Sequence, residues 1–169
     1  IVAPGDPYRS VLYYRISKLG HGRMPQFGSQ VVDRRGVTLF RHWISSLPLA
    51  ANDPSVAVQR LRVEERAALD SLAAAENPGD AVNVALDRLL ISPSGAMRLL
   101  ESIEFNYLAN NVRDAAIARG TTHADPIVRD LFEKFIPEEQ RVKRLGTVIQ
   151  PEAILALSGD ASRGRQSFL

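Results

Sequence analysis

Apolar residues recur every three to four positions from about residue 55 to residue 157, the spacing that places them on one face of an α-helix. Turn-forming residues interrupt this pattern at Asn77-Pro78-Gly79, Ser92-Pro93-Ser94 and Gly120-Thr121-Thr122. Strand signals are weak along the whole chain. The pattern therefore predicts an all-α fold, with a small irregular bundle of short helices. We expect these helices near 55–76, 80–91, 94–104, 106–119, 125–135, 138–145 and 151–157.

The first 50 residues are richer in glycine and proline, and they predict two helices joined by a loop. Pro7 suits a first helical turn, and apolar spacing continues the helix over 9–19 before Gly20. Asp33 is placed to cap a second helix over 34–47. One face of this second helix is predicted to carry Val37, Phe40, Ile44 and Leu47, with Trp43 beside them.

The composition excludes several classes of site. The chain has 169 residues and no cysteine, so it contains no disulfide, thiolate zinc site, iron–sulfur cluster or covalent attachment point for haem. No apolar run approaches the roughly 20 residues that a membrane-spanning helix needs. We therefore expect no membrane span in this chain, and one domain or two small ones.

Charge is distributed unevenly along the chain. Residues 1–50 hold seven basic and two acidic residues, whereas the remainder holds fourteen basic and seventeen acidic residues. The basic segment suits an acidic partner protein, an anionic cofactor edge, nucleic acid, or simply a solvated face. Nucleic acid ranks last, because a segment rich in proline and glycine suits no groove-reading helix.

No catalytic motif is present. The chain has no Gly-rich phosphate loop, and His21, His42 and His123 are scattered rather than spaced as metal ligands. The carboxylate pairs Glu64/Glu65 and Glu138/Glu139 are expected on solvated helix surfaces. The sequence therefore predicts no enzymatic activity.

Met24 is the residue that suggests specific chemistry. A methionine thioether is a soft donor, and haem proteins use it as an axial iron ligand. Pro25 restricts the backbone of Met24, which would hold the sulfur in one orientation. Phe40 and Trp43 offer apolar surface suited to a porphyrin. The alternative is that Met24 packs with these aromatic side chains as ordinary core.

Three segments carry more distinctive residues. The first runs from Ala3 to Arg23-Met24-Pro25 and continues through Gly28-Ser29, Val32-Asp33, Gly36 and Trp43-Ile44. The second covers 125–157, and the third contains Gly159-Asp160, Gly164 and Phe168. Together they resemble the large multidomain haem-binding proteins, or c-type cytochromes, of planctomycete-type bacteria. In that family an Arg-Met-Pro loop precedes a last helix ending in Trp-Ile. The third segment is similar to the helix that precedes Cys-x-x-Cys-His, a motif absent here.

The resemblance implies an internal fragment of a periplasmic or cell-surface electron-transfer protein with redox partner proteins. Residues 1–50 would be the C-terminal part of a cytochrome c-like domain, 51–157 a helical interdomain region, and 158–169 the start of a second such domain. Met24 would be the distal ligand of a haem c, positioned by Pro25, with Phe40 and Trp43 near the macrocycle. Arg23 would pair with a haem propionate. A haem-free helical scaffold or protein-interaction module remains the alternative.

Overall fold

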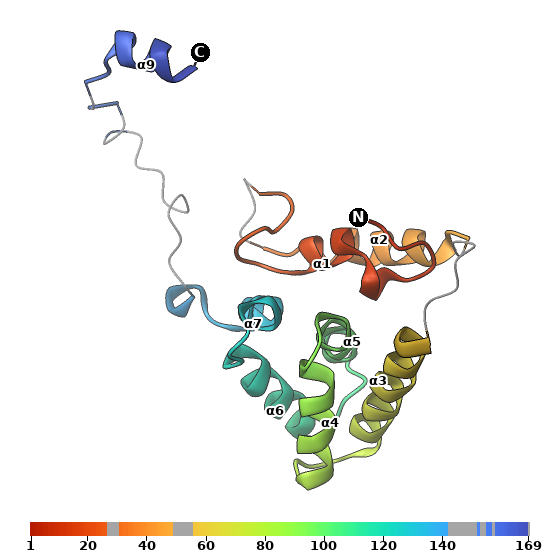
Figure 1. The fold of residues 1–169 in the computed structure, drawn as a ribbon. Coiled ribbons are helices and arrows are strands. Elements are labelled where there is room, and N and C mark those ends of the chain that lie inside the picture. Colours follow the sequence, from red (N-terminus) through yellow and green to blue (C-terminus); the bar gives the residue numbers. More distant parts are fainter. Residues whose placement is uncertain (27–30, 49–55, 142–151, 153–154, 157, 169) are drawn as a thin grey trace.

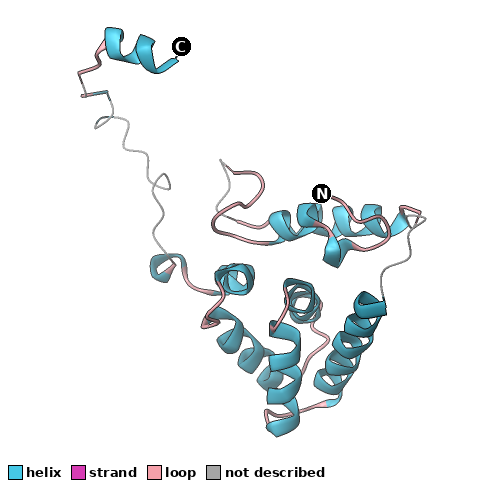
Figure 2. Ribbon diagram, viewed as in Figure 1, coloured by secondary structure: helices cyan, strands magenta, loops and turns pink. Residues whose placement is uncertain are grey.

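A computed structural model describes residues 1–26, 31–48, 56–141, 152, 155–156 and 158–168. The described residues form eight α-helices and three short 3₁₀-helices and contain no strand, which confirms the predicted all-α class (Figure 2). In chain order the helices are η1 (Pro7–Arg9), α1 (Val11–Ser17), α2 (Arg34–Ser46), α3 (Val56–Ala74), α4 (Asp80–Leu90), α5 (Pro93–Glu104), α6 (Asn110–Thr121), α7 (Pro126–Phe132), η2 (Glu133–Phe135), η3 (Glu138–Gln140) and α9 (Ala161–Phe168).

Helix α5 is the centre of the fold. It packs against α3, α4, α6 and α7. It also contacts α1 and η1, which together with α2 form what we call the N-terminal layer. Figure 1 shows α1 and α2 lying above α5 and α7, with α3, α4 and α6 below, and α9 apart from the rest. Half of the residues in α5 are buried, namely Gly95, Ala96, Met97, Leu99, Leu100 and Ile103. The buried apolar residues of both layers belong to one continuous core.

Several helix starts follow from local capping, and the cap predicted at Asp33 is confirmed. The Asp33 carboxylate accepts hydrogen bonds from the backbone N–H groups of Arg35 (3.0 Å) and Gly36 (3.1 Å) at the start of α2. The Ser92 hydroxyl accepts from Gly95 N (3.0 Å) at the start of α5. Asp160 caps α9, the helix expected near the C-terminal end, by accepting from Ser162 N (2.9 Å) and Arg163 N (3.0 Å).

Other boundaries differ from the expectations. The helix predicted over 9–19 is a 3₁₀ turn followed by the shorter α1, which buries Tyr13 rather than Val11. The helix predicted from 106 begins at Asn110, because Asn106 takes a left-handed backbone (φ 56°) that ends α5. The helix predicted over 125–135 continues from α7 into the 3₁₀ turn η2.

The last two predicted helices fall largely outside the described residues. Within 138–145 the described part is the 3₁₀-helix η3, followed by Arg141. Most of 151–157 lies outside the described residues. Among the helices that the structure does describe, none has both the length and the apolar character needed to cross a bilayer.

Close packing of α6 on α7 depends on Gly120, and a substitution there tests the core. A Cβ at Gly120 would lie 2.4–2.6 Å from three ring atoms of the fully buried Phe132. We expect Gly120→Ala to lower the free energy of unfolding by about 1–3 kcal/mol, because the ring has to move within a packed core. Chemical denaturation measures this change. Gly79→Ala is the control, because a Cβ there meets open space, and we expect it to cost less than about 1 kcal/mol.

Candidate functional site

The loop that carries Met24 is held against α1 by backbone interactions. Met24 N donates a hydrogen bond to the carbonyl oxygen of Arg15 (2.9 Å), and Arg15 Nε donates to the carbonyl oxygen of Gly22 (2.6 Å). Gly20 and Gly22 both have positive φ (84° and 72°), which lets the chain turn back toward the helix. The Met24–Pro25 peptide bond is cis. This loop therefore has a defined position relative to α1.

Met24 borders a small cavity of about 150 Å³ between this loop and the first half of α2. Arg23, Pro25 and Phe40 also line it, so the structure brings together four of the five predicted site residues. Met24 is 40% exposed and Phe40 is 36% exposed, so neither residue is part of the buried core. The remaining apolar lining comes from Ile16, Val31, Val32, Gly36 and Val37.

Trp43, the fifth predicted residue, does not line this cavity. Its ring packs edge-on against Phe40, with centroids 6.0 Å apart, and is 45% exposed. The residues predicted along one face of α2 differ in burial. Val37 and Ile44 are buried against the core, whereas Phe40 and Leu39 are exposed. Helix α2 thus presents partly exposed aromatic surface.

Arg23 contributes a positive charge at the edge of the same cavity. Its side chain forms no ion pair with any of the described residues. Its guanidinium therefore remains available to an anionic group brought to the Met24 cavity.

The residues that line this cavity can be compared with those that a haem site needs. The donor set contains one thioether beside apolar and aromatic side chains, which suits one axial ligand and one wall of a haem pocket. The cavity is smaller than the 300–1,000 Å³ typical of sites that enclose a small molecule. Among the described residues no group of three or more His, Asp or Glu side chains is placed to hold a metal ion. The residues fit one side of a haem, and a second side would have to come from elsewhere.

No protein-family model, curated protein or solved structure matches the chain.

One carboxylate of the pair Glu64/Glu65 is buried, contrary to expectation. Glu65, expected on a solvated surface with Glu64, is only 1% exposed. One of its oxygens accepts hydrogen bonds from the hydroxyls of Ser92 (2.9 Å) and Ser94, and the other accepts from Arg98 Nε (2.9 Å). A signal for this was present, because Glu65 shares the buried face of α3 with Ala68 and Leu72 at helical spacing. Glu138 and Glu139, the other pair, are exposed as expected.

A second polar cluster joins the N-terminal layer to α5. The Tyr8 hydroxyl donates to Glu101 Oε2 (2.5 Å), and Arg41 donates to Glu101 Oε1 (2.8 Å). The Arg98 guanidinium lies 4.0 Å from the centroid of the Tyr8 ring, so this cluster continues toward Glu65. Burial, followed by the hydrogen bond to Glu101, raises the pKa of the Tyr8 phenol above its ordinary value. Tyr8 therefore acts here as a neutral hydrogen-bond donor.

Two of the basic side chains near the N-terminus form ion pairs within the molecule. Besides Arg41, Lys18 pairs with Asp130 of α7 (2.9 Å), and both side chains are largely buried. The interpretation of this segment as a solvated basic face is therefore wrong for Lys18 and Arg41. The basic segment and the more acidic remainder meet across the interface between the two layers.

Proposed function

We propose that residues 1–48 form the distal side of a c-type haem domain in an electron-transfer protein, with Met24 as an axial iron ligand. One observation carries this proposal: Met24 is partly exposed beside a cavity that Arg23, Pro25 and Phe40 also line. A methionine in ordinary core packing would be covered by its neighbours. The resemblance of Arg23-Met24-Pro25 and its flanking residues to the c-type cytochrome domains of planctomycete-type bacteria supports the same assignment.

Each residue of the cavity has a definite role in this proposal. Met24 supplies the sulfur ligand, and Pro25 with the Arg15 hydrogen bond holds the loop in place. Phe40, with Trp43 packed against it, covers part of the macrocycle, and Arg23 pairs with a propionate. The haem itself would supply reversible one-electron transfer, and a thioether ligand raises its reduction potential. The chain would have no catalytic role of its own.

The remaining requirements lie outside this sequence. Covalent attachment needs cysteines and the proximal side needs a histidine, so a Cys-x-x-Cys-His segment must be supplied by a longer form of the protein. Helices α3–α7 act in this proposal as the scaffold on which the haem domain rests. Redox partner proteins would approach the haem edge, in the periplasm or at the cell surface.

Spectroscopy of the longer protein tests this assignment. The form that includes the Cys-x-x-Cys-His segment should show the weak far-red band of methionine-ligated ferric haem. Met24→Ala should remove that band and lower the reduction potential, because a thioether favours the ferrous state. Met97→Leu is the control, since Met97 is buried in α5, and it should leave both properties unchanged.

Two results would contradict the proposal: a longer protein without the attachment motif, or a Met24→Ala variant with an unchanged spectrum. Either would favour the second candidate, a haem-free helical interaction module. One observation supports that candidate as well. The exposed Leu39, Phe40 and Trp43 side chains form an apolar face on α2 that could receive a protein partner.

A further inference from the structure

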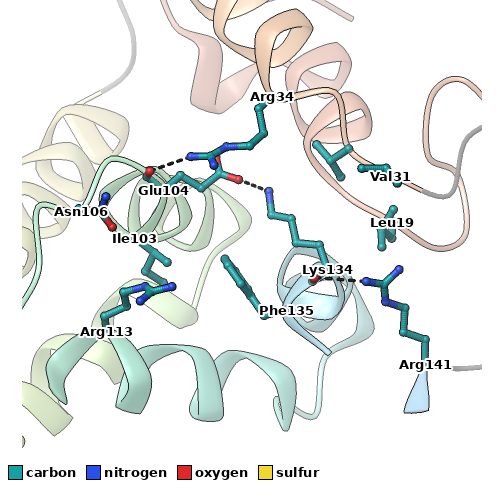
Figure 3. A pocket seen from close by; sticks show the side chains of 11 residues that line it. Leu19, Val31, Arg34, Ile103, Glu104, Asn106, Arg113, Lys134, Phe135 and Arg141 are labelled. Carbon is teal, nitrogen blue, oxygen red and sulfur yellow. Dashed lines mark hydrogen bonds and ion pairs between the residues drawn. The ribbon is translucent and has the colours of Figure 1, made fainter. Parts of the chain in front are cut away.

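A larger cavity lies where the N-terminal layer meets α5, α6 and η2. It has a volume of about 320 Å³, within the lower range for small-molecule sites. Its lining comes from the segment before α2 and the start of that helix, the C-terminal end of α5, and residues of α6 and η2. Figure 3 shows the charged side chains of Arg34, Glu104, Lys134 and Arg141 around it, with Phe135 and Ile103 on its apolar side.

Positive charge dominates this cavity. Four cationic side chains line it, namely Arg34, Arg113, Lys134 and Arg141, against the single carboxylate of Glu104. Lys134 donates to Glu104 Oε1 and so neutralises that carboxylate. Burial lowers the pKa of Lys134, Glu104 opposes this shift, and the nearby Arg34 charge adds to the lowering. Because Glu104 offsets only one of the four cations, the cavity keeps an excess of positive charge.

The arginines do not find carboxylates in the described part of the chain. Arg34 donates to the backbone carbonyl oxygen of Glu104 (2.8 Å) rather than to its carboxylate. Arg141 donates through Nε to the carbonyl oxygen of Ile136 (2.8 Å). These carbonyl contacts hold the guanidinium groups in place without cancelling their charge. Such fixed guanidinium groups suit the planar oxygen pairs of carboxylate and phosphate.

Arg113 adds a further guanidinium group to the lining of this cavity. Its Nε is buried and has no hydrogen-bond partner among the described residues. A buried unsatisfied donor costs about 1–3 kcal/mol, so such groups are uncommon unless something else satisfies them. In Figure 3 the Arg113 side chain extends from α6 toward Ile103 and Asn106. Arg41 Nε and Arg62 Nε are in the same state away from this cavity, so Arg113 supports an anion site through its positive charge in the lining.

We propose that this cavity binds a small organic oxyanion, with a carboxylate or phosphate group held by the arginines and an apolar part packed against Ile103, Leu19 and Phe135. The apolar lining makes a free inorganic ion a poorer fit than a molecule with a hydrocarbon or aromatic body. The site goes beyond the proposed haem function and does not depend on it, since none of Arg23, Met24, Pro25, Phe40 and Trp43 lines this cavity.

Calorimetric titration of the 169-residue chain at low salt tests the site. The probes are phenyl phosphate, benzoate, inorganic phosphate and uncharged benzyl alcohol. We expect phenyl phosphate or benzoate to bind one molecule per chain, and which of them binds more tightly identifies the oxyanion. Inorganic phosphate should bind more weakly, and benzyl alcohol should not bind. The proposal is overturned if neither aromatic anion binds, or if benzyl alcohol binds as well as they do.

Variants locate the binding. Arg113→Met should weaken the tighter anion at least about tenfold, because it removes a charge-assisted hydrogen bond. The variant should fold, since it also removes an unsatisfied buried nitrogen. Arg60→Met is the matched control, because Arg60 is an exposed cation on α3 away from the cavity. Arg141→Met provides a second loss of affinity at the opposite side of the site. Unchanged affinity in both Arg113→Met and Arg141→Met would refute this location.

Discussion

Glu65→Ala is expected to lower the free energy of unfolding by about 3–5 kcal/mol, the cost of breaking a buried ion pair by removing one partner. The loss follows from the partners that Glu65 leaves behind. Arg98 would keep a largely buried charge without its carboxylate, and the hydroxyls of Ser92 and Ser94 would lose their shared acceptor. The start of α5, where Ser92 is the capping residue, would lose its connection to α3.

Glu64→Ala provides a control on the adjacent residue of the same helix. Glu64 forms ion pairs with Arg60 and Arg88, but these lie near the surface, so we expect a loss of no more than about 1 kcal/mol. Urea denaturation followed by circular dichroism measures both variants. The double variant Glu65→Ala/Arg98→Met should be more stable than the sum of its two single changes predicts, because it leaves no unpaired charge. Equal losses for Glu64→Ala and Glu65→Ala would contradict the role assigned to this carboxylate.

The helices that the sequence predicts best are those whose signals are local. Asp33 and Ser92 accept hydrogen bonds from backbone N–H groups within three residues of themselves, so the starts of α2 and α5 are encoded by a few adjacent positions. The turn that leads into the Met24 loop is local too, since Gly20 and Gly22 permit the positive φ angles that it needs. These features required no knowledge of the rest of the chain.

Features that depend on distant contacts could not be predicted in the same way. Tyr8 and Glu101 are 93 positions apart in sequence, and no pattern within either segment indicates that they pair. Phe40 has the spacing of a core residue, yet α2 packs through Val37 and Ile44 and leaves it exposed. The partners of Glu65 in α5 likewise lie far from it in sequence, although its spacing with Ala68 and Leu72 indicates the buried face of α3. In each case the apolar pattern correctly predicts a helix, but it does not indicate which residues of other helices that helix contacts.

Glu101→Ala is expected to loosen the N-terminal layer that carries Met24. Removing this carboxylate leaves the Tyr8 hydroxyl and the Arg41 guanidinium without their shared acceptor, and Arg41 Nε is already buried without a partner. We expect a loss of about 2–3 kcal/mol, since hydrogen bonds to charged groups contribute about 1.5–3 kcal/mol each and both sites retain some solvent. Tyr8→Phe, which removes a single hydroxyl, should cost about half as much.

Hydrogen exchange distinguishes local release from global unfolding. If the polar cluster anchors the layer, amides of α1 and α2 should exchange faster in Glu101→Ala, while those of α6 change little. Glu101→Gln keeps two polar groups at this position and should restore part of the protection. Equal acceleration in α2 and α6 would mean that the continuous core alone joins the layers. In that case the N-terminal layer could not separate from α5 without unfolding of the helices that share this core.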